Sequence, residues 1–109
     1  PDVILFAPGS VYATVGEDAA WQNVNAIKNG TYYEVPVGPY NWMGFPPSVQ
    51  RMLGMMWMAK LLYPDAADYD LQAEITEYFK LFYHTDLTAD AYNALVANSI
   101  GAVEAKAAA

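Results

Sequence analysis

NAIKNGTYYEVPVGPYNWMGFPPSVQRMLGMMWMAKLLYP, residues 25–64, decides the fold class of this chain. The first residues of this stretch are predicted to end a helix at Asn29, because Gly30 can take the left-handed conformation that stops a helix. Thr31–Val37 alternates β-branched and aromatic residues, a pattern typical of a strand. After a loop, residues 48–62 predict a helix with a serine at its N-cap. A strand followed by a helix is the unit from which α/β folds are built.

The sequence on either side of this stretch adds further elements of the same kind. The additional predicted elements are a buried strand at Val3–Phe6 and helices at Glu17–Lys28, after an N-cap at Asp70, and at Thr88–Ala97. Residues 98–109 are rich in alanine and lack an apolar stripe, so they predict a frayed tail after a domain of residues 1–97. The expected architecture is α/β, with a small, mostly parallel sheet flanked by helices.

Two features predict that this domain belongs to a larger unit. The predicted helix over residues 48–62 is apolar on nearly every side, so it is either buried or faces a partner on its second side. Two strands also make a thin sheet for a free-standing domain, and Pro1 stands just before the first of them. We therefore expect a fragment, with further strands upstream or supplied by another chain.

Composition excludes several classes of function. With 109 residues, 55% of them apolar, the chain can bury the core of one domain. Its formal net charge of −7 argues against nucleic-acid binding, which needs a basic surface. It has no cysteine and no apolar run long enough to span a membrane. No nucleophile elbow, P-loop, dinucleotide fingerprint or zinc-protease motif is present, so we predict that it is not an enzyme.

Candidate metal ligands do not combine into a metal site. His84 is the single histidine, and its place at the end of a predicted helix favours a histidine that the helix dipole stabilises at the C-terminus over a metal ligand. The acidic stretch of residues 65–70 does not match a calcium loop, because its spacing is wrong and the closing glutamate is missing. The methionines at positions 52, 55, 56 and 58 spread around their helix, which favours core packing over coordination of a soft metal.

The loop after the second strand is the best candidate for a binding site. Tyr40, Trp42 and Phe45 place three rings between glycines and prolines, with Asn41 beside them. Ring faces can hold a macrocycle, a catechol or a sugar, and loops at strand ends commonly carry ligand sites. Two other interpretations stay open: the rings can simply cover the edge of the sheet, or they can serve a carbohydrate- or peptide-binding module.

Three segments, taken in order, resemble a known family. The succession of residues 21–36, then Trp42 to Pro47-Ser48, then residues 53–64 is similar to the C-terminal lobe of ABC-transporter substrate-binding proteins, in the class that binds iron–siderophore complexes, haem or cobalamin. The resemblance implies a three-layer, Rossmann-like lobe, one of two joined by a long helix. It also implies a chelated metal complex as ligand, bound in the cleft between the lobes.

The resemblance further implies partners and site residues. The partners are an N-terminal lobe and an ABC permease, and the location is periplasmic or at the cell surface, where a lipoprotein anchor upstream is the only link to the membrane. The implied ligand contacts are Tyr40, Asn41, Trp42, Phe45 and, by a looser match, Ser10 and Tyr12 in the turn after the first strand. The chain departs from the family at residues 44–47, where some relatives carry an acidic residue that docks onto the permease.

Overall fold

The two strands form a short parallel sheet. The computed structural model describes residues 1–108, in which β1 (Ile4–Phe6) pairs with β2 (Tyr32–Glu34) in parallel. Both strands are shorter than predicted. The N–H of Val35 still donates to the carbonyl of Phe6 at 3.0 Å, but the next residue, Pro36, has no N–H to extend the ladder. The predicted α/β class and the parallel pairing are confirmed.

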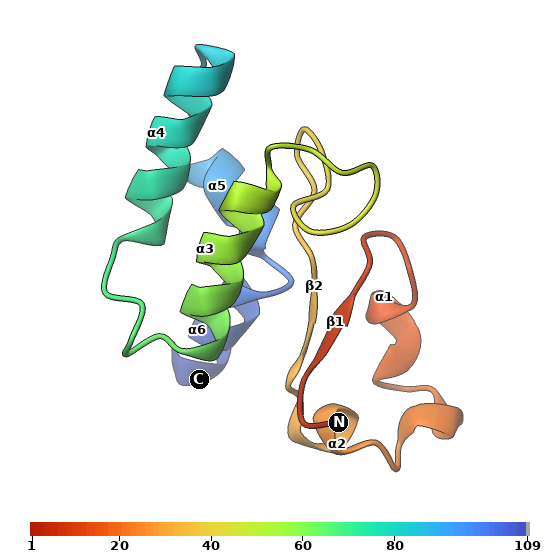
Figure 1. Ribbon diagram of the computed structural model, residues 1–109. Helices are drawn as coiled ribbons and strands as arrows, with labels where there is room; N and C mark the ends of the chain where they lie inside the picture. The colour runs from red at the N-terminus through yellow and green to blue at the C-terminus, as the bar shows by residue number, and fades with distance from the viewer. Residues whose placement is uncertain (109) are drawn as a thin grey trace.

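Helices lie on both sides of this sheet (Figure 1). The helices are α1 (Tyr12–Val15), a 3₁₀ turn η1 (Ala19–Trp21), α2 (Asn25–Asn29), α3 (Arg51–Leu62), α4 (Leu71–Tyr83), α5 (Ala89–Val96) and α6 (Ile100–Ala108). Figure 1 shows α1 and α2 on one side of the strands and α3 to α6 on the other. The loops that follow β1 and β2 lie at the same end of the sheet, as parallel strands require.

The crossover between the strands is more broken than predicted. A single helix over Glu17–Lys28 is wrong, because this range contains η1 and most of α2 with an extended residue, Val24, between them. The side-chain amide of Gln22 donates to the carbonyls of Gly16 and Asp18, each at 2.9 Å, and closes a local turn. Gly30 ends α2 in the left-handed conformation, as predicted.

The predicted helix ends at Asp70, His84 and Thr88 match the structure, whereas the one at Ser48 does not. The side chain of Asp70 accepts from the N–H of Ala73 and caps α4, and Thr88 caps α5 in the same way. His84 ends α4 with a left-handed backbone, which agrees with its predicted position at a helix C-terminus. Ser48 is not the N-cap of α3: its hydroxyl accepts from the N–H of Gln50 within a turn, and the helix starts one residue later.

The C-terminal segment differs from the expected frayed tail at residues 98–109. Helix α6 occupies most of it, and the Nζ of Lys106 donates to the carbonyl of Gly30 at 2.6 Å. Just before α6, the buried hydroxyl of Ser99 accepts from the indole N–H of Trp57 at 2.9 Å. These contacts tie the segment to the residue that ends α2 and to helix α3. Ala109 lies outside the described residues.

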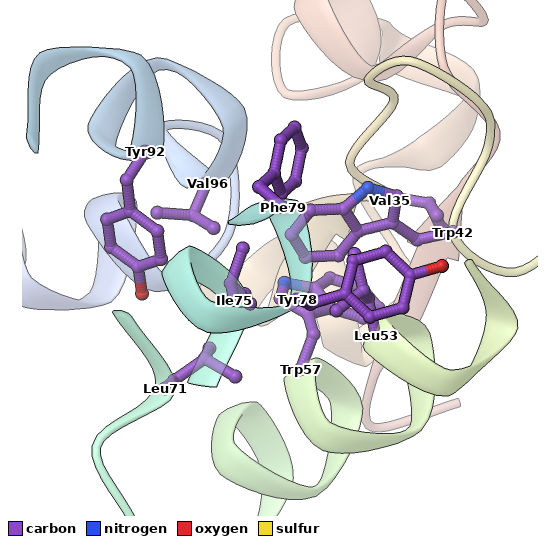
Figure 2. Packing of buried hydrophobic residues seen from close by; sticks show 10 residues of the cluster. All are labelled: Val35, Trp42, Leu53, Trp57, Leu71, Ile75, Tyr78, Phe79, Tyr92 and Val96. Atoms are coloured by element: carbon purple, nitrogen blue, oxygen red, sulfur yellow. The ribbon is translucent and has the colours of Figure 1, made fainter. Parts of the chain in front are cut away.

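The core has two parts on opposite sides of the sheet. Figure 2 shows the larger one, which β2, the loop after it, α3, α4 and α5 build together. Its members are Val35, Trp42, Leu53, Trp57, Leu71, Ile75, Tyr78, Phe79, Tyr92 and Val96. The smaller part centres on Phe6, Val15 and Ile27 under α1 and α2. Within residues 1–108, no helix is both long and apolar enough to cross a membrane.

Helix α3 has one buried and one exposed side. Leu53 and Trp57 are fully buried, whereas Met52 and Met55 on the outward side are exposed. The sequence predicted either full burial or a side that faces a partner. Full burial is therefore wrong, and a partner for the outward side stays a prediction.

Candidate functional site

A hollow of about 590 Å³ opens at the end of the sheet where both strands end. It lies between the turn after β1 and the loop after β2. Its walls are formed by Ala7, Pro8, Val37, Pro39, Tyr40, Asn41, Gly44, Phe45 and Pro46. In open α/β sheets, ligands bind outside the carboxyl ends of the strands, so the position alone makes this hollow a candidate site.

Two rings dominate the wall that the loop contributes. The side chain of Tyr40 is 51% exposed and that of Phe45 is 85% exposed. Rings this open to water gain free energy when a ligand covers their faces. The structure thus brings together three of the predicted contact residues, since Asn41 lines the same hollow.

Asn41 both shapes the loop and offers a polar group. Its Oδ1 accepts from the N–H of Met43 at 2.9 Å and from the N–H of Gly44 at 2.7 Å. In the part of the chain that the structure describes, its side-chain NH₂ group has no hydrogen-bond partner. The amide can therefore donate to a ligand without loss of its contacts within the loop.

Trp42, one of the predicted ligand contacts, does not line this hollow. Its side chain is 0% exposed and packs in the larger core cluster, with its indole N–H donating to the carbonyl of Gly38 at 3.2 Å. Helix α3 comes so close that a Cβ on Gly54 would lie 2.1 Å from the carbonyl oxygen of Trp42. The ring anchors the loop to α3, and no face of it is open to a ligand.

Ser10 and Tyr12 do not line the hollow either. Ser10 is exposed and closes a turn through a bond from its N–H to the carbonyl of Ala7. The ring of Tyr12 packs against that of Tyr32, with 5.7 Å between centroids, and burial raises the pKa of its hydroxyl. Tyr12 packs against the smaller core part and Ser10 stays in its exposed turn, so the structure does not place them with the loop residues.

Several residues of the site were not predicted from the sequence. Ala7 and Pro8 directly follow β1, and the rule that ligands bind where parallel strands end was the signal that could have found them. Val37 separates the hollow from a second one of about 450 Å³ beside α5. Gln50, beneath the loop, is fully buried, although a glutamine just before an apolar helix carries no obvious signal.

The hollow carries no charge of its own. None of its lining residues is acidic or basic, and Arg51 at the start of α3 turns its Nε to the carbonyl of Met43 instead. Within residues 1–108, no group of three or more histidine or acidic side chains is arranged to hold a metal ion. The site can therefore offer apolar faces, one side-chain amide and backbone groups, but not direct coordination of a bare metal ion.

Comparisons with known proteins agree with this geometry. No protein-family model matches the chain. An ABC-transporter solute-binding protein from Sulfurospirillum deleyianum superposes on 87% of it with a TM-score of 0.78 and 32% identity. A periplasmic solute-binding protein from Veillonella parvula superposes on 90% of it with a TM-score of 0.73 and 31% identity. The chain is related to periplasmic solute-binding proteins of ABC transporters.

A curated sequence supports the same relationship. The molybdate-binding protein MolA of Haemophilus influenzae is 34% identical over 74 residues, which are 67% of this chain. The chain spans only 21% of that protein and 29% and 32% of the two solved structures. Solute-binding proteins are not enzymes, so the relationship confirms the prediction that this chain is not an enzyme. It also confirms the predicted extracytoplasmic location. None of these three relatives is named for a siderophore, haem or cobalamin.

Proposed function

We propose that this chain forms part of the solute-binding component of an ABC importer and supplies one wall of its ligand site. The observation that carries the proposal is the pair of exposed rings, Tyr40 and Phe45, at a hollow where both strands end. The relationship to solute-binding proteins supports it independently. A second lobe would close the other side of the ligand, and the loaded protein would deliver it to the permease.

The walls of the hollow favour a ligand with flat, apolar faces. Apart from Asn41, the side chains that line it are apolar or aromatic, and none is charged. A bare oxyanion is usually held by several N–H donors or by basic side chains. A chelated metal complex, such as an iron–siderophore complex, haem or a corrinoid, instead presents organic surface to stack on rings. We therefore propose a metal complex as the ligand.

Molybdate is the second candidate ligand. It is favoured by one observation, the similarity to MolA of Haemophilus influenzae. Molybdate would need donors that this wall does not supply, beyond the NH₂ group of Asn41 and backbone N–H groups. Under this alternative the second lobe would provide most of the contacts with the anion.

A ligand panel tests the proposal. The purified protein is titrated with haemin, cobalamin, a ferric siderophore and sodium molybdate, and binding is followed by calorimetry. We expect saturable binding of one metal complex, weakened several-fold by Tyr40→Ala because a stacked ring contributes about 0.5–1.5 kcal/mol. Tyr63→Ala is the matched control, since Tyr63 is similarly exposed but stands at the end of α3, outside the hollow.

The outcomes separate the alternatives. Binding of molybdate alone would overturn the metal-complex proposal and leave the solute-binding role standing. Equal losses in the two tyrosine variants would show that the hollow is not the ligand site. Binding of no compound in the panel would count against the whole proposed function.

A further inference from the structure

We infer that Gln50 is a positioning residue for the ligand loop: it holds the loop in its binding conformation without touching the ligand. The inference rests on the proposed function, because it concerns the site that the loop forms. Gln50 is one of two polar residues in the described chain that are fully buried, and it does not line the hollow. A buried amide of this kind is retained only where its hydrogen bonds are satisfied.

The amide of Gln50 satisfies its hydrogen bonds entirely on the loop. Its Oε1 accepts from the N–H of Tyr40 at 2.6 Å, and its Nε2 donates to the carbonyl of Gly38 at 2.9 Å. These two backbone groups flank Pro39, so a single side chain fixes the loop on both sides of that residue. The direction in which the Tyr40 ring leaves the backbone is set by these bonds.

The other end of Gln50 is fixed to α3. Its N–H donates to the hydroxyl of Ser48 at 3.1 Å, and its carbonyl accepts from the N–H of Gly54 at 3.0 Å in the first turn of the helix. The side chain therefore connects the rigid helix α3 to the loop through hydrogen bonds at both ends of the residue. Rigid elements that support a binding loop lower the conformational cost of binding.

Few side chains can replace Gln50 in this role. The contact needs one acceptor and one donor side by side, which a primary amide supplies. Methionine fills a similar volume with neither group, and a carboxylate supplies an acceptor but no donor toward the carbonyl of Gly38. Without the amide, the N–H of Tyr40 must turn toward water to find a partner, and the loop populates conformations in which the hollow is not formed.

Gln50→Met is the decisive variant, with Gln72→Met on the exposed side of α4 as the matched control. The first readout needs no ligand: hydrogen exchange at the amide of Tyr40. We expect this amide to be protected in the wild type and in Gln72→Met and to exchange faster in Gln50→Met, while amides inside α4 stay protected. Unchanged protection of Tyr40 in a folded Gln50→Met protein overturns the inference.

The second readout is affinity for whichever probe of the panel, haemin, cobalamin, ferric siderophore or molybdate, binds the wild type. We expect Gln50→Met to weaken it by about tenfold or more, since affinity falls in proportion to the competent fraction of the loop. Equal affinity in a folded Gln50→Met protein also overturns the inference. If the wild type binds no probe, the proposed function fails, whereas the exchange measurement still decides whether Gln50 orders the loop.

Gln50→Glu keeps the test valid if Gln50→Met does not fold. Once ionised, its carboxylate places an acceptor against the carbonyl of Gly38, so at a pH above the pKa of this buried carboxyl binding relative to the wild type should be weakened. On acidification the protonated carboxyl offers one donor and one acceptor again, and relative binding should recover. A Gln50→Glu protein that binds like the wild type at a pH where the new carboxyl is ionised contradicts the positioning role.

Discussion

The loop after β2 has an inner half, which contains Trp42, and an outer half, which contains Phe45. The two halves differ in how far their aromatic side chains are buried. Trp42 and Phe45 are three residues apart, yet the first side chain is 0% exposed and the second 85% exposed. The indole N–H of Trp42 has an acceptor inside the loop, and Gly54 leaves room for its backbone. Within residues 1–108, no other side chain covers the ring of Phe45. An aromatic residue in a loop is thus committed to the core or to the surface by what surrounds it, not by its type.

The largest expected effect is on the inner half. Trp42→Ala removes a fully buried ring from the larger core cluster, and we expect it to lower the free energy of unfolding by about 3–5 kcal/mol. Urea unfolding followed by circular dichroism measures this loss. A loss below about 1 kcal/mol would break the comparison, because it would mean that Trp42 is as dispensable to folding as a surface ring.

The contact between the loop and α3 provides the next test. Gly54→Ala would favour an isolated helix by roughly 1 kcal/mol. Here the new Cβ would meet the carbonyl oxygen of Trp42 at 2.1 Å, so we expect a destabilisation of about 1–3 kcal/mol instead. Thermal unfolding compares it with Met55→Ala at the next, exposed position, where we expect little change. A stabilised Gly54→Ala protein would show that the loop does not rest on the helix.

The pH dependence of stability tests the larger core cluster, which contains both Trp42 and Tyr92. Burial raises the pKa of Tyr92 to about 12, with Glu104 and Asp70 adding to the effect. The unfolded chain ionises this hydroxyl near pH 10, so stability is intact below pH 10 and falls as the pH rises toward 12. We expect a loss of about 1–2 kcal/mol in that window, after allowance for partial solvent screening.

Tyr92→Phe serves as the control for this pH effect. The variant lacks the ionisable hydroxyl, so its stability should fall less between pH 10 and pH 12 than that of the wild type. Denaturant titrations at closely spaced pH values compare the two proteins. Identical pH profiles would assign the alkaline loss to other tyrosines of the core.

The smallest effect on stability is expected in the outer half. Phe45→Ala should change the free energy of unfolding by less than about 0.5 kcal/mol, because the ring is almost fully exposed. It should nevertheless weaken solute binding by about 0.5–1.5 kcal/mol, the value of one aromatic contact. Phe82→Ala, an exposed phenylalanine on α4 outside the hollow, should leave binding unchanged. Loss of stability without loss of binding in Phe45→Ala would reverse the comparison.

Local signals predicted the fold where local contacts decide it. The caps at Asp70 and Thr88 bind N–H groups three residues ahead, and the strand patterns are visible in short windows. The break before α2 was missed because it depends on the side chain of Gln22 reaching back to Gly16. Helix α6 was missed for a similar reason, since its attachment through Lys106 reaches a carbonyl 76 residues away.

The candidate site was predictable in location but not in detail. The spacing of glycines and prolines placed a loop with rings at the strand end, and Tyr40 and Phe45 do line the hollow. Trp42 could not be told apart from them, because its burial depends on the close approach of α3. Gln50 gave no signal at all, since both of its partners are backbone groups of the folded loop.

The bond between Trp57 and Ser99 has a consequence for the order of events during synthesis. The indole N–H is buried in the finished protein, and its acceptor lies 42 residues further along the chain. A ribosome completes β1, β2 and α3 well before it adds Ser99, so the nascent chain cannot complete its larger core cluster until the residues around Ser99 have been made. Until then the indole N–H of Trp57 lacks the acceptor that it has in the folded protein, so α3 is synthesised long before its packing can be completed.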